Sequence, residues 1–498
     1  MDNLLQLKVI GPILRSAWTW RLLRTACLVL LLAMAAWGWH HHRIAGLEVR
    51  DPLMYTSLTN HLFWVWWIMG VVFVALLFGR SWCAVCPLGW LNGLFSRIGF
   101  RFERPQWLRN FIPVTLVLIL LQLMVYFFAI HRYPDYTAIL LTLCIVLAAG
   151  AGLLFRERAF CTLLCPAGAV FGLYARIAPF QLRVVDRNVC NACDSQRCIA
   201  EPTEWRQHRI GSTVLYRRHQ LDGCPVSLVP SELADSADCT LCLNCMQNCD
   251  KQNVKLGFRS WLTDLYSSGL RPSETFFFLA LLGMLTANFS KVFVELRDSI
   301  FWLPEQVSLL LGWQENGFYV IAVIWIALLL PILLMLPGYI IFKLGQIKTT
   351  ELSELPDSVT EIEAGEHPGF WANLGRLALP FIPMILSAHA VLALVKINAK
   401  AGYLLYAIGD PSGIKPFLAM NVMQTVTPPG VLIPLDILKW LIAIVLVIGL
   451  LISYRVGFLS GKSRLAEVDR SYLAATAVGV TLLFSIYMAT VIEWLFIR

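Results

Sequence analysis

Long apolar runs separated by short polar segments dominate the chain. A helix needs about 20 residues to cross a hydrocarbon layer of about 30 Å, and nine runs approach or exceed that length. The pattern therefore predicts an all-α polytopic membrane protein with about nine transmembrane helices. The runs lie near residues 22–39, 61–79, 111–130, 137–155, 273–290, 317–342, 372–396, 431–454 and 472–495.

One long polar segment interrupts this pattern. Residues 181–270 contain hardly any apolar run, yet they hold eight of the 14 cysteines. The sequence thus predicts three parts. They are a membrane region over residues 1–180, a polar insert over 181–270, and a C-terminal membrane region of about five helices over 271–498.

Composition and charge narrow the class and predict an orientation. The chain is 58% hydrophobic and only 14% charged, which excludes a cytosolic enzyme and a nucleic-acid-binding protein. The basic residues gather before the first run and after the even-numbered runs. By the positive-inside rule, we expect the N-terminus and the insert in the cytoplasm and the C-terminus outside.

The N-terminal membrane region contains an internal repeat. The segment RSWCAVCPLG, which begins at Arg80, matches the segment RAFCTLLCPAG, which begins at Arg158. Each Cys-Pro motif follows a pair of apolar runs, so both are expected on the same membrane face. The 1–180 region therefore reads as two repeated hairpins, each ending in a Cys-Pro motif.

The insert carries cysteines in a ferredoxin-type spacing. The run Cys239-x2-Cys242-x2-Cys245-x3-Cys249 is typical of [4Fe–4S] sites, and in two-cluster ferredoxins the fourth cysteine of such a run binds the other cluster. A second group stands upstream, with x4 where x2 is usual. The spacing thus predicts a ferredoxin-like domain with two [4Fe–4S] clusters. One would be bound by Cys190, Cys193, Cys198 and Cys249, and the other by Cys239, Cys242, Cys245 and Cys224.

Zinc and disulfides explain these cysteines less well. Structural zinc sites favour two separated Cys-x2-Cys pairs over one run of four cysteines. Disulfides are rare in the cytoplasm, where the charge pattern places the insert. Iron–sulfur clusters are therefore the favoured interpretation.

The Cys-Pro motifs leave three interpretations open. Cys83, Cys86, Cys161 and Cys165 would together hold a third metal site or cluster, form redox-active dithiols, or simply mark helix ends with proline. The two remaining cysteines, Cys27 and Cys144, lie inside apolar runs and are expected to be core residues.

Histidines in or beside the apolar runs are further candidates. His389 lies inside the seventh run with Lys396 two turns later, and an ionisable group in a membrane helix is a functional hypothesis by default. For His389, we expect a quinone contact or a proton path as much as a packing role. For His61 and His131 we expect a capping or interfacial role, and for His40, His41 and His42 a solvated loop.

The paired Cys-Pro motifs followed by a two-cluster insert resemble the NapH and NosR type of membrane ferredoxin proteins. The resemblance covers roughly residues 60–255. It implies a multi-pass protein of the bacterial cytoplasmic (inner) membrane that transfers electrons between the quinone pool and a respiratory partner. That partner would be a cytochrome, a ferredoxin-like subunit or a reductase.

In that family role the chain would contact membrane lipid and a bound quinone, with no nucleic acid. It would be the electron-transfer subunit of a quinol-oxidising or quinone-reducing oxidoreductase. One alternative function is a membrane metalloreductase or metal-centre maturation factor, similar to the CcoG-type accessory proteins. Another is a metal-stabilised assembly subunit with no turnover.

Overall fold

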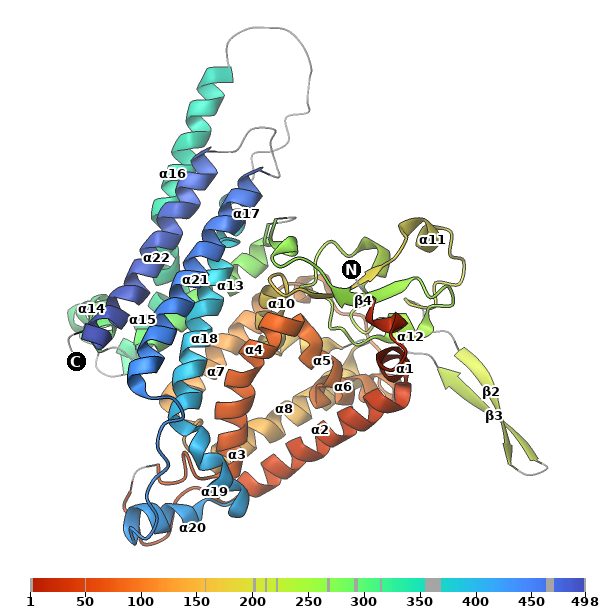
Figure 1. The fold of residues 1–498 in the computed structure, drawn as a ribbon, viewed down its shortest axis with the longest axis horizontal. Helices are drawn as coiled ribbons and strands as arrows, with labels where there is room; N and C mark the ends of the chain where they lie inside the picture. The colour runs from red at the N-terminus through yellow and green to blue at the C-terminus, as the bar shows by residue number, and fades with distance from the viewer. Residues whose placement is uncertain are drawn as a thin grey trace. The chain divides into compact units, whose positions relative to one another are not determined.

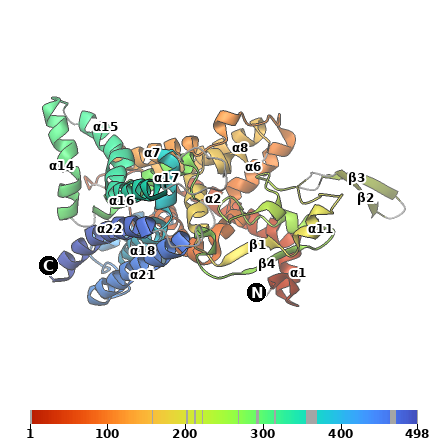
Figure 2. The same cartoon turned by 90° about the horizontal axis from the view of Figure 1, so that it is seen from above.

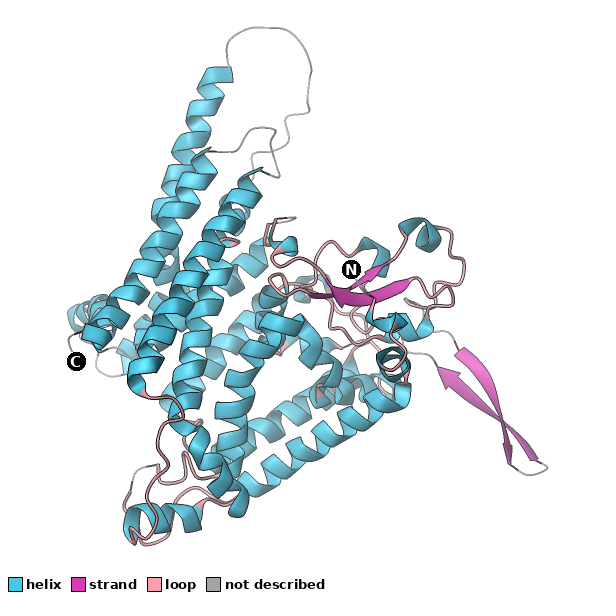
Figure 3. Cartoon of the chain, viewed as in Figure 1, coloured by secondary structure: helices cyan, strands magenta, loops and turns pink. Residues whose placement is uncertain are grey.

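The computed structural model shows a mainly helical chain with two small two-stranded sheets (Figures 1 and 3). It describes residues 3–49, 51–156, 158–199, 203–210, 213–220, 223–266, 269–290, 294–313, 316–353, 369–462 and 470–496.

Seven of the described helical stretches are long and apolar enough to cross a membrane. They coincide with seven of the nine predicted runs, so the multi-pass helical fold is confirmed. The stretches are Ala17–Gly38, Leu58–Ile98, Pro134–Leu154, Gly317–Gly345, Phe381–Gly409, Leu435–Gly461 and Arg470–Trp494.

The other two predicted runs also form helices, but the count of nine is not confirmed. Helix α7 (Ile112–Phe127) has 16 residues, which is short for a span. Helix α13 (Pro272–Ser290) has 19 residues, and Glu274 and Asn288 lower its mean hydropathy. Most of its side chains are buried against other helices, so it reads as a core helix.

The chain divides into two compact units. The first comprises residues 1–39, 74–109 and 135–264, and the second comprises 40–73, 110–134 and 265–498. All 14 cysteines fall in the first unit. The three-part division predicted at residues 180 and 270 stays a prediction, because one unit can combine membrane helices with a polar domain.

The first unit joins membrane helices to the strands of the insert. Its helices and strands are α1 (Ile10–Arg15), α2 (Ala17–Gly38), α5 (Trp82–Val85), α6 (Pro87–Ile98), α8 (Pro134–Leu154), α9 (Ala159–Leu163), α10 (Pro166–Ala175), β1 (Phe180–Val184), α11 (Arg187–Asn191), β2 (Thr203–Ile210), β3 (Thr213–Gln220), α12 (Asn244–Asn248) and β4 (Val254–Phe258).

The insert contains two pairs of antiparallel strands. Strands β1 and β4 lie side by side and antiparallel, with Phe180 opposite Phe258 and Val184 opposite Val254 (Figure 2). Strands β2 and β3 form a separate antiparallel hairpin. Since β1 precedes and β4 follows all eight insert cysteines, their pairing brings the two ends of the cysteine-containing segment together.

The second unit is a helical bundle. In it α16 and α21 pack against α22, and α18 packs against α21. Its helices are α3 (Leu58–Asn60), a π-helical turn (His61–Trp67), α4 (Ile68–Phe78, whose last turns belong to the first unit), α7, α13, α14 (Val294–Leu310), α15 (Asn316–Ile324), α16 (Leu330–Ser353), α17 (Phe370–Ala378), α18 (Phe381–Lys400), α19 (Leu404–Gly409), α20 (Ile414–Phe417), α21 (Leu435–Lys462) and α22 (Arg470–Phe496).

Candidate functional site

Four insert cysteines line one small cavity with apolar walls, and we call them the Cys224 set. Its members are Cys224, Cys239, Cys242 and Cys245. Between the last three, Leu241 and Leu243 adopt left-handed backbone angles, with φ of 49° and 65°. Such angles are uncommon for leucine and turn the chain tightly, so that the cysteines face a common centre. The structure thus brings together the four cysteines grouped from the sequence.

Cys242 and Cys245 of the Cys224 set are buried, and Cys224 and Cys239 are half-buried. Burial raises the pKa of the Cys239 thiol to about 12 and that of Cys224 to about 11. Both groups are therefore neutral near pH 7 in the metal-free chain. Because iron binds thiolates, loading a cluster here would displace their protons.

The other four insert cysteines form the Cys190 set. Cys198 interacts electrostatically with the remaining three members. The set consists of Cys190, Cys193, Cys198 and Cys249. Cys245 of the Cys224 set also interacts with Cys198, so the two sets are neighbours.

Asn253 connects two members of the Cys190 set that are far apart in sequence. Its backbone N–H donates to Sγ of Cys249 at 3.3 Å, and its side-chain Nδ2 donates to Sγ of Cys190 at 3.2 Å. The same amide group is fixed by Asp186, whose carbonyl accepts from Nδ2 at 2.6 Å and whose N–H donates to Oδ1 at 3.0 Å. Asn253 therefore holds the crossed cysteine beside the upstream group.

The two Cys-Pro motifs have the same local structure. Cys86 directly precedes α6, and Cys165 directly precedes α10. In both helices proline takes the first position, where it lacks only an N–H that has no helical partner. Sγ of Cys165 accepts a hydrogen bond from the N–H of Gly168 at 3.4 Å. A helix N-terminus stabilises negative charge, which suits a thiolate or an anionic cluster.

The four Cys-Pro cysteines converge in the structure, and we call them the Cys-Pro set. Cys165 interacts electrostatically with Cys161, Cys86 and Cys83. Cys161 and Cys165 also pack against an apolar cluster that includes Phe160, and Cys144 belongs to the same surroundings. The convergence favours one shared site over separate dithiols. The proline helix ends are present as well, so those two interpretations are compatible.

A buried arginine from each repeat packs against a glycine of the other. A β-carbon added to Gly89 would lie 3.4 Å from Nη1 of Arg158 and 3.2 Å from Sγ of Cys161. A β-carbon added to the matching Gly168 would lie 3.4 Å from Nη2 of Arg80. Arg80 and Arg158 are only 6% and 5% exposed. The repeats therefore interlock reciprocally around the Cys-Pro set.

The same arginines reach toward the Cys224 set. Arg80 interacts with Cys83 and donates from Nη1 to the carbonyl of Ala237 at 2.5 Å, two residues before Cys239. Arg158 donates from Nη1 to the carbonyl of Cys83 at 3.2 Å. Its backbone N–H donates to the carbonyl of Pro225 at 2.8 Å, directly after Cys224.

Arg24 of α2 makes a third link of this kind. It donates from Nε to the carbonyl of Ala84 at 2.7 Å and from Nη2 to that of Cys242 at 3.4 Å. Three arginines thus place the Cys-Pro set beside the Cys224 set.

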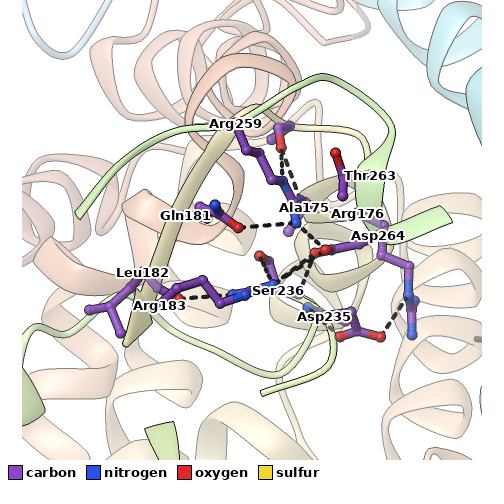
Figure 4. Close-up of polar contacts among 12 residues, drawn as sticks. Ala175, Arg176, Gln181, Leu182, Arg183, Asp235, Ser236, Arg259, Thr263 and Asp264 are labelled. Atoms are coloured by element: carbon purple, nitrogen blue, oxygen red, sulfur yellow. Dashed lines mark hydrogen bonds and ion pairs between the residues drawn. The ribbon is translucent and has the colours of Figure 1, made fainter. Parts of the chain in front are cut away.

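A buried ionic network anchors the segment that leads into Cys239 (Figure 4). Asp264 accepts from the backbone N–H of Ser236 at 2.6 Å and pairs with Arg183 at 3.3 Å and with Arg259. Arg259 also donates to the carbonyls of Ala175 and Ala178 at 3.2 and 3.1 Å. These contacts tie the insert to the end of α10, and therefore to the second repeat.

Within the described residues, no group of three or more His, Cys, Asp or Glu side chains lies close enough to hold one metal ion. Four thiolates on a zinc ion, each at about 2.3 Å, lie about 3.8 Å apart. A cubane places each thiolate on a different iron, and its thiolates are more widely separated. The three sets are thus compatible with clusters.

The predicted quinone or proton residues lie in the second unit. His389 and Lys396 interact electrostatically on α18, and Lys396 is exposed. His61, expected to be interfacial, is fully buried and lies near Tyr55 and Lys400. His131 packs edge-on to Trp64 at 6.1 Å, and His42 stacks on Tyr133 at 4.3 Å.

Sequence reasoning missed the residues that surround the cysteines. Arg80 and Arg158 occupy matching positions of the repeat, and that match was the available signal for them. Asn253 follows the last cysteine by four residues with no recognisable motif, so nothing in the sequence marked it.

Comparison with known proteins supports an iron–sulfur assignment. Residues 60–105 and 137–184, which contain the two Cys-Pro motifs, match the family described as "4Fe-4S binding domain". The "Putative electron transport protein YccM" of Escherichia coli (strain K12) is 24% identical over 294 residues, covering 47% of this chain and 74% of its own length.

The "Uncharacterized protein MJ0749" of Methanocaldococcus jannaschii is 23% identical over 212 residues, covering 41% of this chain and 71% of its own length. No solved structure matches the chain. The comparisons thus show that the chain is similar to a 4Fe–4S binding domain and to a putative electron transport protein. They do not confirm the resemblance to the NapH and NosR type in particular.

Proposed function

We propose that this protein carries electrons between a quinone in the membrane and a redox partner protein. It would act in the bacterial cytoplasmic membrane, with its N-terminus and insert in the cytoplasm and its C-terminus outside. The family match and the electron-transport description of the E. coli relative support iron–sulfur electron transfer. The quinone, the partner and the orientation belong to the proposal.

The observation that supports the proposal most strongly is that the three cysteine sets lie next to one another in succession. A [4Fe–4S] cluster, when bound, supplies one-electron chemistry at a potential that depends on hydrogen bonds, charge and exposure. Arg24, Arg80 and Arg158 join the Cys-Pro set to the Cys224 set. Cys245 and Cys198 then join the Cys224 set to the Cys190 set. We therefore propose four ligands for each of three clusters.

The residues around the cysteines are suited to stabilising charged centres. Arg80 and Arg158 place buried positive charge beside the thiolates, and Asn253 and the N-terminus of α10 donate N–H groups to sulfur. Such donors favour the more negative, reduced form of a cluster. Apolar side chains pack against the half-buried Cys161 and Cys165 at the same place.

Reduction by quinol tests the proposal. Purified, anaerobically prepared protein should show bleaching of its iron–sulfur absorbance when ubiquinol or menaquinol analogues are added. Clusters that bleach with dithionite but with neither quinol would contradict the quinone link while leaving the iron–sulfur assignment in place.

A further inference from the structure

Arg80 is a buried cation that lies beside two of the cysteine sets. It is only 6% exposed, and its Nη2 would lie 3.4 Å from a β-carbon added to Gly168, just after the last cysteine of the Cys-Pro set. Its Nη1 donates to the carbonyl of Ala237 at 2.5 Å, just before the Cys224 set resumes at Cys239. Arg80 accordingly interacts electrostatically with a thiol of each set, Cys161 and Cys239.

Arg158 has the equivalent position in the second repeat. It is only 5% exposed, and its Nη1 would lie 3.4 Å from a β-carbon added to Gly89. The same Nη1 donates to the carbonyl of Cys83 at 3.2 Å. Arg158 interacts electrostatically with Cys161 of the Cys-Pro set and with Cys224 of the Cys224 set. Each repeat thus contributes one buried cation to the boundary between the same two sets.

The surroundings of these two arginines differ from those of an arginine in the ionic network. Arg259 pairs with the buried carboxylate of Asp264. Arg80 and Arg158 instead hydrogen-bond to backbone carbonyls, and Asp238 also acts electrostatically on Arg80. The thiols beside Arg80 and Arg158 become anionic when they bind iron. Both arginines are therefore placed to compensate charge that develops on the cysteine sets.

We propose that Arg80 and Arg158 are counter-ions shared by the Cys-Pro set and the Cys224 set, and that each raises the reduction potential at both. Reduction adds one negative charge at a set. A buried cation beside it stabilises that charge, because the protein interior screens charges far less than water does. The inference rests on the iron–sulfur part of the proposed function and does not involve the quinone.

Sharing the counter-ions has a consequence for electron transfer. An electron that moves between the Cys-Pro set and the Cys224 set stays beside the same two cations. The arginines therefore stabilise the electron at its origin and at its destination alike, and they do not trap it at either set. The Cys190 set lies outside their contacts, so its potential should be independent of them.

Redox titration of the full-length protein with dithionite, followed by electron paramagnetic resonance, tests the inference. Cys165→Ser, Cys242→Ser and Cys249→Ser identify the signals of the Cys-Pro, Cys224 and Cys190 sets. Arg158→Gln should make reduction of the first two sets about tenfold less favourable, which is about 59 mV for a one-electron couple. The signal of the Cys190 set should keep its potential.

Lysine variants separate the charge of the arginines from their shape. Arg158→Lys keeps the positive charge and should restore most of the lost potential at both sets, a result that a merely structural role does not predict. Arg80→Gln and Arg80→Lys should behave in the same way. If the glutamine variants lost iron and the lysine variants kept it, the positive charge would be required there, as the inference expects. Loss of iron from the lysine variants as well would overturn it.

The matched control is Arg109→Gln, which removes a positive charge from an exposed position of the same unit. It should leave all three potentials nearly unchanged, because solvent and salt screen an exposed charge. A shift of one signal alone, an equal shift of all three, or no shift in Arg158→Gln would overturn the inference and leave the iron–sulfur assignment in place. A parent protein without iron–sulfur signals would contradict that assignment, and the inference with it.

Discussion

Asn253 contacts two cysteines from opposite ends of the insert. Its N–H groups reach Cys249 and Cys190, although 59 residues separate these two cysteines in the sequence. Such a contact depends on the pairing of β1 with β4, which leads Asn253 back to Asp186. The crossed arrangement therefore rests on backbone topology and on one amide side chain.

Serine substitutions test the crossed arrangement. Cys249→Ser should remove the paramagnetic signal of the Cys190 set, and Cys242→Ser should remove that of the Cys224 set, because serine is a poor substitute for a thiolate ligand. Electron paramagnetic resonance of the dithionite-reduced variants distinguishes the two. If Cys249→Ser and Cys242→Ser erased the same signal, the crossed arrangement would be wrong.

Asp264 is the residue on which the insert's ionic network depends. It is 3% exposed and binds Arg183, Arg259 and the N–H of Ser236. Asp264→Asn keeps the size but leaves two guanidinium groups without their carboxylate. Breaking a buried pair in this way costs about 3–5 kcal/mol, so the variant should unfold at a clearly lower temperature.

Thermal loss of the iron–sulfur absorbance measures this effect. The matched control is Asp298→Asn, which breaks an exposed contact with Arg297 and should leave the transition nearly unchanged. Equal transitions for Asp264→Asn and the parent would show that the network does not stabilise the insert.

At the scale of elements, α6 offers an internal comparison between two glycines. Gly89→Ala would place a β-carbon 3.2 Å from Sγ of Cys161, whereas Gly93→Ala would meet nothing within 4 Å. Alanine favours a helix over glycine by about 1 kcal/mol at both positions. We therefore expect Gly89→Ala to perturb the Cys-Pro set and Gly93→Ala to be neutral or stabilising.

Iron content and magnetic resonance spectra provide the measurement. Gly89→Ala should lose or shift only the signal of the Cys-Pro set, with the other two signals unchanged. Identical spectra for Gly89→Ala, Gly93→Ala and the parent would mean that no cluster lies against Gly89.

The sequence predicted the elements better than their contacts. Seven of the nine apolar runs correspond to long apolar helices. Cysteine spacing predicted the two insert sets, whose members lie near one another in the structure, whereas the repeat left a shared Cys-Pro site as one of three interpretations. Burial was harder to anticipate. His61 stands at the edge of an apolar run, yet it is fully buried in the second unit. Burial of α13 depends on which helices surround it, and the sequence of α13 alone does not contain that information.

Arg80 and Arg158 illustrate the same limit at the site. Their matching positions in the repeat were visible, but their contacts reach across 157 residues to Ala237 and 75 residues to Cys83. Local periodicity contains no information about such distant partners. Whether the cysteine sets bind clusters stays a prediction that iron chemistry must test.

At the scale of the whole molecule, the first quantity to measure is the iron content. Three loaded sets predict about 12 irons per chain, and the two insert sets alone predict about 8. Chemical iron and sulfide analysis of anaerobically purified protein distinguishes these values. Stoichiometric zinc without iron would contradict the electron-transfer function as a whole.

In the proposed function, the Cys-Pro set connects the membrane quinone to the insert. The most direct test compares quinol-driven with dithionite-driven reduction of the insert clusters in Cys86→Ser and Cys165→Ser. Because both cysteines belong to one converged set beside the Cys224 set, either substitution should abolish reduction by quinol and leave reduction by dithionite normal. Quinol reduction at the parental rate in both variants would contradict the claim and leave the motifs as helix ends.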